Sequence, residues 1–150
     1  MNKLWWLGVL LSAQAAGADL PKTPVNNLFD AMREHDAEKL LAQFTDKALL
    51  QRALPDGSVR QSDIKKFAKS IAQSTAFLDE HLLSVSVQRS GNLATVWTPY
   101  AFYLNEKLSH CGVNSFQVVE TQEGWKIQYL IDNSHQGDCQ TFIELHEPTN

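Results

Sequence analysis

Cysteine, basic charge and long apolar runs are all scarce in this chain. It has two cysteines in 150 residues, and its 13 lysines and arginines stand against 17 aspartates and glutamates, a formal net charge of −4. Without a run of basic residues, it lacks the charge pattern of proteins that bind nucleic acid or anionic membrane surfaces. After residue 18 there is no apolar segment of membrane-spanning length and no internal repeat. These absences favour a single acidic domain with one core.

Motifs of several enzyme and metal-protein classes are also missing. No His/Cys pair has the spacing of a closed zinc site, and there is neither a Gly-rich phosphate loop nor a Gly-x-Ser-x-Gly turn. A nucleophilic pair of Cys111 with His110 is disfavoured, because adjacent residues of a strand point to opposite faces. We therefore expect no metal and no cofactor.

The first 18 residues have the order of a secretory signal peptide. Lys3 carries one positive charge, an apolar run follows over residues 4–11, and small residues end at Ala18. The apolar run is too short to span a bilayer about 30 Å thick. We predict cleavage before Asp19, which leaves residues 19–150 as one periplasmic or secreted domain with no membrane attachment. The alternative is an N-terminal anchor or a buried first helix.

The sequence favours a disulfide between its two cysteines, Cys111 and Cys139. Export would place them in an oxidising compartment, where an even cysteine count favours a disulfide. Such a bridge closes a loop of about 29 residues and contributes roughly 3–3.5 kcal/mol in the chain-entropy treatment. Two unpaired thiols, or half of a metal site, are the alternatives.

Apolar residues at helical spacing predict three helices in the first half of the domain. Thr23 is the expected cap of a first helix over residues 24–35, and Asp36 caps a short second helix. Ser62 or Gln61 begins the third. A short strand over residues 48–54, followed by a turn, separates the second helix from the third.

Alternating apolar residues then predict four consecutive antiparallel strands, over residues 83–88, 93–104, 109–120 and 125–132. Pro99 falls inside the second of these strands, which requires a bulge, a bend or an edge position there. A tail follows from about residue 134, with weak strand character only at residues 141–145. The order predicts an α+β domain with three N-terminal helices packed on one face of a strongly curved antiparallel sheet.

Residues 94–103, 109–116 and 124–127 resemble exported bacterial members of the nuclear transport factor 2-like superfamily, some of which are described as lumazine-binding-like. The resemblance covers nearly all of residues 24–139. It implies a cone-shaped fold, a cavity between sheet and helices, and frequent homodimers through the outer face of the sheet. The ketosteroid isomerases of this superfamily use a Tyr from the first helix, which is absent here, so we carry over no catalytic residue.

Hairpin pairing predicts which side chains face the cavity. Pairing Glu120 with Trp125 and Leu104 with Leu108 puts one set of strand residues on the concave face. The candidate ligand pocket on that face consists of Thr98, Tyr100, Phe102, His110, Asn114, Phe116 and Tyr129. An apolar wall with a few convergent polar groups is typical of a small-molecule site. In an enzyme, His110 would be the acid or base and Tyr100 the oxyanion donor; otherwise these two side chains satisfy each other at the rim of a packed core.

The opposite face carries Trp97, Tyr103 and Val113, and the same pairing puts Leu130 and Asp132 there. Exposed aromatic residues on a sheet favour a homodimer interface, unless the C-terminal tail covers them. The sequence thus supports three hypotheses. The first is an exported, non-catalytic domain that binds a small, partly apolar ligand. The others are an acid/base enzyme of the isomerase or dehydratase type, and a structural or interaction module whose cavity is filled by side chains.

Overall fold

The structure is a computed structural model of the chain and describes residues 20–148. The helices in this part are α1 (Thr23–Arg33), α2 (Ala37–Leu41), α3 (Ile64–Gln73) and α4 (Cys139–His146). The strands are β1 (Phe44–Ala53), β2 (Val59–Ser62), β3 (Leu78–Leu82), β4 (Ser86–Ser90), β5 (Leu93–Leu104), β6 (Lys107–Thr121) and β7 (Gly124–Ser134). The predicted signal peptide, residues 1–18, lies outside the described residues. No helix within residues 20–148 is long and apolar enough to span a membrane.

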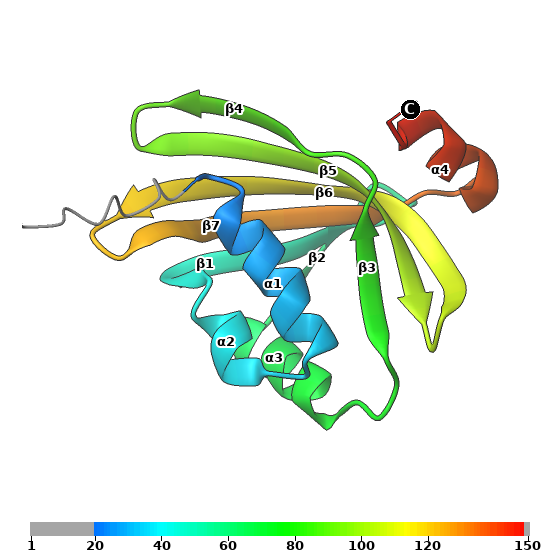
Figure 1. Cartoon of the computed structure of the whole chain (residues 1–150), viewed down its shortest axis with the longest axis horizontal. Helices are drawn as coiled ribbons and strands as arrows, with labels where there is room; N and C mark the ends of the chain where they lie inside the picture. The colour runs from blue at the N-terminus through cyan, green and yellow to red at the C-terminus, as the bar shows by residue number, and fades with distance from the viewer. Residues whose placement is uncertain (1–19, 149–150) are drawn as a thin grey trace, which may run out of the picture.

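All the strands join one curved sheet, in the order β2-β1-β7-β6-β5-β3, with β4 also paired to β5. Every pair is antiparallel except β1 with β7, which run parallel. The helices α1, α2 and α3 lie against the concave face, whereas α4 packs at one end of the other face (Figure 1). The predicted α+β class is therefore confirmed, with β1 and β2 inserted between the second and third helices.

The helices begin at residues that suit their capping positions. Asp36 and Asp63 each accept a hydrogen bond at 2.9 Å from the backbone N–H three residues later, as Asp does at a helix N-cap. The Asp36 cap was predicted, but α3 is capped by Asp63 rather than by Ser62 or Gln61. The first helix includes Thr23, its predicted cap, as its first residue.

Pro99 lies where the neighbour of β5 changes. On the same edge of β5, β3 pairs as far as Tyr100 and β4 starts opposite Trp97. No ladder bond therefore needs an N–H from Pro99, and its carbonyl accepts from the backbone N–H of Leu83 at 2.9 Å. The strand predicted over residues 83–88 is present only in part: residues 83–85 connect β3 to β4, residues 86–88 belong to β4, and β4 is exposed throughout instead of half-buried.

The β6–β7 pair contains a bulge that changes which residues face the helices. The pair starts in the predicted register, with Val118 opposite Ile127. One extra residue in β7 then places Phe116 opposite Leu130, not opposite Tyr129 as predicted. Because side chains alternate along a strand, the bulge moves Leu130 to the concave face and Tyr129 to the outer one. A second shift, near the β5–β6 turn, replaces the predicted partner of Leu104.

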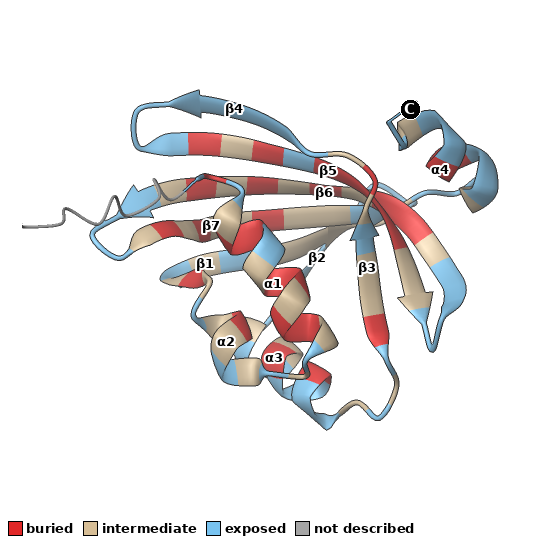
Figure 2. Ribbon diagram, viewed as in Figure 1, coloured by how far each residue is buried: buried red, intermediate tan, exposed pale blue. Residues whose placement is uncertain are grey.

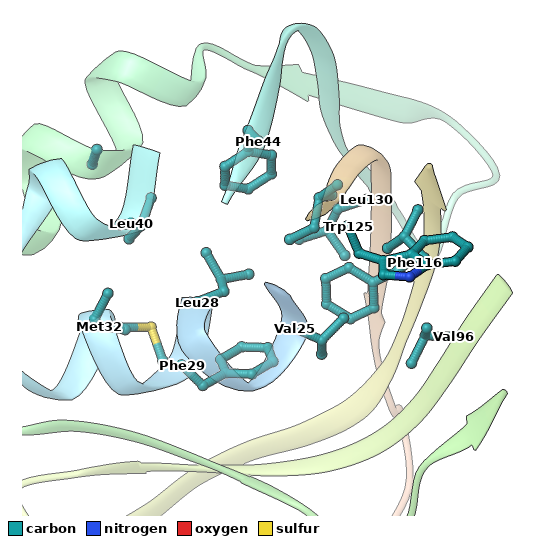
Figure 3. Close-up of a cluster of buried hydrophobic side chains, with 14 of the residues drawn as sticks. Val25, Leu28, Phe29, Met32, Leu40, Phe44, Val96, Phe116, Trp125 and Leu130 are labelled. Atoms are coloured by element: carbon teal, nitrogen blue, oxygen red, sulfur yellow. The ribbon is translucent and has the colours of Figure 1, made fainter. Parts of the chain in front are cut away.

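The main core lies between α1, α2, α3 and the concave face (Figures 2 and 3). The first helix buries Val25, Leu28, Phe29 and Met32, which are the residues whose spacing predicts it. Phe116 from β6 meets the Phe29 ring edge-to-face, with ring centroids 6.3 Å apart. Full burial of each such side chain contributes about 1.5–3 kcal/mol, so this layer fixes α1 on the sheet.

A second, smaller cluster lies under α4 on the outer face. Its buried members are Leu83, Ala101, Cys111, Phe142 and Ile143. The predicted disulfide between Cys111 and Cys139 is present and joins β6 to the first residue of α4. Residues 141–145, expected to be at most a weak strand, are helical because α4 lays Phe142 and Ile143 on the sheet. The C-terminal tail therefore covers one end of the outer face.

Candidate functional site

A cavity of about 200 Å³ lies between the helices and the concave face of the sheet. Most of its wall is apolar and consists of Leu28, Phe29, Met32, Leu40, Phe67, Ile71, Leu78, Phe102 and Leu130. Its polar residues are Arg52 on β1, Glu80 on β3, and His110 and Asn114 on β6. Because β1 and β3 are separated by three strands in the sheet order, the curvature of the sheet is what brings Arg52 and Glu80 to one cavity.

Glu80 is positioned from both sides of its strand. Its backbone lies opposite Phe102 in the β3–β5 ladder. On the free edge of β3, the Arg33 guanidinium bridges from α1, donating to the Asp79 carboxylate at 3.0 Å and to the Glu80 carbonyl at 3.5 Å. The carboxyl group of Glu80 then meets Asn114, whose Nδ2 donates to Oε1 at 2.6 Å.

The carboxyl of Glu80 forms no ion pair with any residue that the structure describes. Burial raises its pKa to about 8, and the charge of Asp132 acts in the same direction. The hydrogen bond from Asn114 and the charge of Arg52 oppose the rise but do not cancel it. At neutral pH the group is therefore largely a neutral carboxylic acid, which can donate a hydrogen bond.

Arg52 and Asp132 form an ion pair between the two parallel strands. They lie opposite each other in the β1–β7 register, and Nε of Arg52 donates to Oδ1 at 2.9 Å and to Oδ2 at 3.0 Å. The guanidinium Nη2 also donates to Oδ2, which makes the contact two-pronged. The hydrogen bonds that Arg52 donates to Asp132 raise the pKa of Arg52, so the guanidinium keeps its charge, and its pairing with the carboxylate leaves no net charge.

His110 lies beside the cavity with its ring among aromatic groups. Its ring centroid is 5.0 Å from that of Phe102 and 5.8 Å from that of Tyr100. Burial lowers the pKa of His110, and the charge of Arg52 lowers it further, against the opposing effect of Asp132. His110 is therefore neutral at pH 7. Its Nδ1 lies 3.1 Å from Ser109 Oγ, which leaves Nε2 available for a hydrogen bond to another group.

The polar end of the cavity can thus donate and accept hydrogen bonds and exchange a proton, but it carries little net charge. Glu80 is the group with an accessible proton near neutral pH. Within residues 20–148, no three His, Cys, Asp or Glu side chains are grouped so that they could hold a metal ion.

Comparison with known proteins identifies the fold. No sequence family matches the chain, and no curated protein matches it by sequence. Among solved structures, a provisionally named dehydratase of the NTF2-like family from Streptomyces avermitilis superposes with a TM-score of 0.62 at 18% identity, covering 76% of this chain and 92% of that one. A domain of unknown function with a cystatin-like fold from Nostoc punctiforme gives 0.59 at 17%, covering 82% and 80%. A provisionally named scytalone dehydratase from Novosphingobium aromaticivorans gives 0.63 at 14%, covering 75% and 80%.

The chain has the nuclear transport factor 2-like fold. This confirms the resemblance drawn from the strand segments, at the level of the fold. The sequence identities are low, so the activities named for these proteins do not transfer to this chain by likeness alone.

Within the NTF2-like cone, three of the predicted pocket residues line the cavity: Phe102, His110 and Asn114. Tyr100 is buried beside them, but its hydroxyl donates to the backbone carbonyl of Asn133 at 2.9 Å. Burial raises the pKa of Tyr100 strongly, so this hydroxyl keeps its proton. Thr98 is fully buried, and its hydroxyl has no hydrogen-bond partner among the described residues.

The other two predicted pocket residues lie elsewhere. Phe116 belongs to the core against Phe29. Tyr129 lies on the far side of the sheet because of the bulge in β7, and its hydroxyl donates to Gln51 Oε1 at 2.8 Å.

Sequence reasoning missed Glu80 and Arg52 and placed Asp132 on the wrong face. The same bulge that turns Tyr129 outward turns Asp132 towards Arg52. For Glu80 a signal exists: Leu78, Glu80 and Leu82 alternate with Asp79 and His81, which indicates a strand with a single carboxyl on its apolar face.

Trp97 is an exposed aromatic residue on the outer face of the sheet. Trp97 is 49% exposed and borders a shallow apolar groove of about 130 Å³ with Val113 and Ile131. Tyr103 and Val113 pack against the small cluster under α4. Of the three predicted interface residues, Trp97 is thus the most accessible.

Proposed function

We propose that this NTF2-like domain binds a small, mostly apolar molecule inside the cone, and that Glu80 holds the polar end of that molecule. The observation that carries the proposal is the Glu80 carboxyl itself, which faces a cavity of about 200 Å³ without an ion-pair partner among the described residues. An apolar wall with a few convergent polar groups is the usual make-up of a small-molecule site.

A purely structural role accounts less well for the same residues. Enclosing a carboxyl group without a cationic partner is unfavourable, and an apolar residue at position 80 would pack against Leu78 and Phe102 without that penalty. A perturbed titratable group in a concave site is instead a common feature of binding and catalytic sites. The cavity volume likewise weighs against a module filled by its own side chains.

The test is native mass spectrometry of the purified protein, with two matched variants. Leu28→Trp places a bulky ring in the cavity wall, whereas Leu49→Trp adds the same ring at a residue that is 42% exposed. We expect a bound mass that leaves on mild activation in the wild type and in Leu49→Trp, and its loss in Leu28→Trp. Circular dichroism checks that both variants fold. Retention of the bound mass in a folded Leu28→Trp protein would place the ligand outside the cone.

The second candidate is an enzyme that transfers a proton at the same site, and the pKa of Glu80 near 8 favours it. Two of the structural neighbours are provisionally named as dehydratases, a reaction class that uses acid and base groups. Glu80 would exchange the proton with His110 as its neutral partner, because the Tyr100 hydroxyl is engaged with a carbonyl.

A one-ring ketone dissolved in D2O tests this second candidate. A base that removes a proton from the carbon next to the carbonyl returns a deuteron, which NMR detects as loss of the proton signal. We expect deuterium exchange with the wild type and its loss in Glu80→Gln. His110→Ala separates an enzyme from a non-catalytic binding domain. In an enzyme this variant should lose turnover, whereas a binding domain should lose affinity only modestly. Equal exchange in the wild type and Glu80→Gln would reject Glu80 as the base.

We also propose that the chain is exported and cleaved before Asp19, as the order of residues 1–18 predicts. The disulfide supports an oxidising compartment. Intact-mass measurement after expression with the full N-terminus should give a protein that starts at Asp19 and lacks two thiol hydrogens. An uncleaved or fully reduced protein would contradict export.

A homodimer through the outer face remains part of the proposal. It would use Trp97 and the adjoining groove, because α4 already covers the far end of that face. Light scattering should show a dimer that dissociates in Trp97→Ser. A monomeric wild type at micromolar concentration would reject it. Membership of the lumazine-binding-like subgroup stays a prediction.

A further inference from the structure

The size and charge of the cavity restrict the class of ligand that it accepts. An apolar cavity of ~150 Å³ in another protein holds benzene. The cavity here is about 200 Å³, so its volume suits one six-membered ring with a small substituent better than two fused rings. Apolar residues of α1 and α3 on one side and Leu130 on the other would enclose the ring.

The charges around the polar end sum to nearly zero. Arg52 and Asp132 neutralise each other through their two-pronged ion pair. Glu80 keeps its proton and His110 is uncharged at neutral pH. A charged ligand would therefore enter an apolar enclosure without a free counter-ion, which is unfavourable. An uncharged ligand avoids that cost.

Two of the free polar atoms at this end are donors. Asn114 occupies Oε1 of Glu80, which leaves the protonated Oε2 as a donor to a ligand. Arg52 uses Nε and Nη2 on Asp132, which leaves Nη1. Neither Oε2 of Glu80 nor Nη1 of Arg52 has a hydrogen-bond partner in the described part of the chain. Two donors at one end of an apolar cavity complement a hydrogen-bond acceptor.

We infer that the cavity takes an uncharged one-ring molecule whose hydrogen-bond acceptor, such as a carbonyl oxygen, lies against Glu80 and Arg52. This inference rests on the proposed function, since it names the class of molecule for the same site. It also excludes carboxylates and amines of the same size, and it requires a hydrogen-bond acceptor, which a merely hydrophobic cavity would not require.

Four probes of nearly identical shape test the inference. Benzamide is neutral with a carbonyl acceptor, benzoate is anionic, benzamidinium is cationic, and α-methylstyrene has no polar atom. Their affinities are measured by isothermal titration calorimetry at pH 6.5, together with 2-naphthamide as a two-ring control. We expect benzamide to bind about tenfold or more tightly than each of the other four, a margin that corresponds to one good hydrogen bond.

Two variants connect that preference to Glu80. In Glu80→Gln, the amide oxygen accepts from Asn114 and the amide N–H replaces the carboxylic proton, so benzamide should still bind. Wild-type affinity should fall as the pH rises through about 8, because the donating proton is lost, whereas the affinity of Glu80→Gln should not change with pH. Glu106→Gln, an exposed turn residue, is the control and should behave as the wild type.

The outcomes separate the ligand class from the proposed function. Tighter binding of benzoate or benzamidinium than of benzamide overturns the charge argument but leaves ligand binding in place. Tighter binding of 2-naphthamide overturns the size argument in the same way. A pH dependence shared by the wild type and Glu80→Gln overturns the role of the Glu80 proton. If no probe of either size binds, both the ligand class and the proposed function are rejected.

Discussion

The stability of this protein should fall as the pH rises between about 4.5 and 8, and Glu80 should be the cause. Its pKa is 4.5 in an unfolded chain and about 8 in the folded protein. Over that interval the folded state retains a proton that the unfolded state has released. Since the folded state then binds more protons, the free energy of unfolding decreases with pH.

The magnitude follows from the same two values. Each pKa unit is worth about 1.4 kcal/mol, so the interval from 4.5 to about 8 corresponds to about 5 kcal/mol between the two ends. The contribution of Glu80 is fully present below pH 4.5 and lost above pH 8. This change is a large part of the roughly 5–15 kcal/mol by which small domains are stable.

Urea unfolding of the wild type and Glu80→Gln across this pH range measures the effect. Other groups contribute equally to both proteins, so the difference between their free energies of unfolding isolates Glu80. That difference should grow with pH in favour of Glu80→Gln, at up to about 1.4 kcal/mol per pH unit. Glu106→Gln, in an exposed turn, should show no such trend. A difference between the wild type and Glu80→Gln that stays constant with pH would refute the burial argument.

Three further changes probe the surroundings of the site. Gly112→Ala should destabilise the protein by about 1–3 kcal/mol or more in urea unfolding, because the new Cβ would lie 2.0 Å from a backbone carbonyl oxygen of β7. Arg52→Ala should cost about 1–3 kcal/mol by the same assay, since it leaves the Asp132 carboxylate, 15% exposed, without its partner; Arg52→Ala with Asp132→Asn should recover part of the loss. Replacing both Cys111 and Cys139 with Ser should lower stability by about 3 kcal/mol and remove any response to a reducing agent.

The sequence was sufficient for the parts of the fold that local patterns determine. The period of the apolar residues predicts α1, expected over residues 24–35 and found at Thr23–Arg33, and the long strand β5, whose predicted bounds match. The two cysteines predict their bridge. By contrast, α4 has too few apolar residues to be recognised alone and is helical because Phe142 and Ile143 pack on the sheet. The short strand β3 lies outside the run of consecutive hairpins, because it pairs with β5 and not with β4, the next strand along the chain.

The site was predicted less well than the fold. Which side chains face the cavity depends on a one-residue shift in strand register and on pairing between strands that are distant in the sequence. The β5–β6 register was correct around His110 and Asn114, so these residues were found. One extra residue in β7 reverses every later side chain, and no turn or glycine in residues 125–134 signals it. Arg52 meets Asp132 only because β1 runs parallel to β7, a pairing that cannot be read from either segment alone.

Stability and the proposed binding make opposite demands on Glu80, and this conflict is the strongest argument for the proposed role of the residue. If the carboxyl only filled space, replacement by an apolar residue of similar size would improve the protein, because the cost of enclosing it would vanish. We therefore expect Glu80→Leu to unfold at a higher urea concentration than the wild type at pH 8 and to lose the binding of benzamide. A variant that gains stability and keeps its affinity would show that the donor at position 80 contributes nothing to recognition. A variant that loses both would indicate that Glu80 and Asn114 form a structural contact instead.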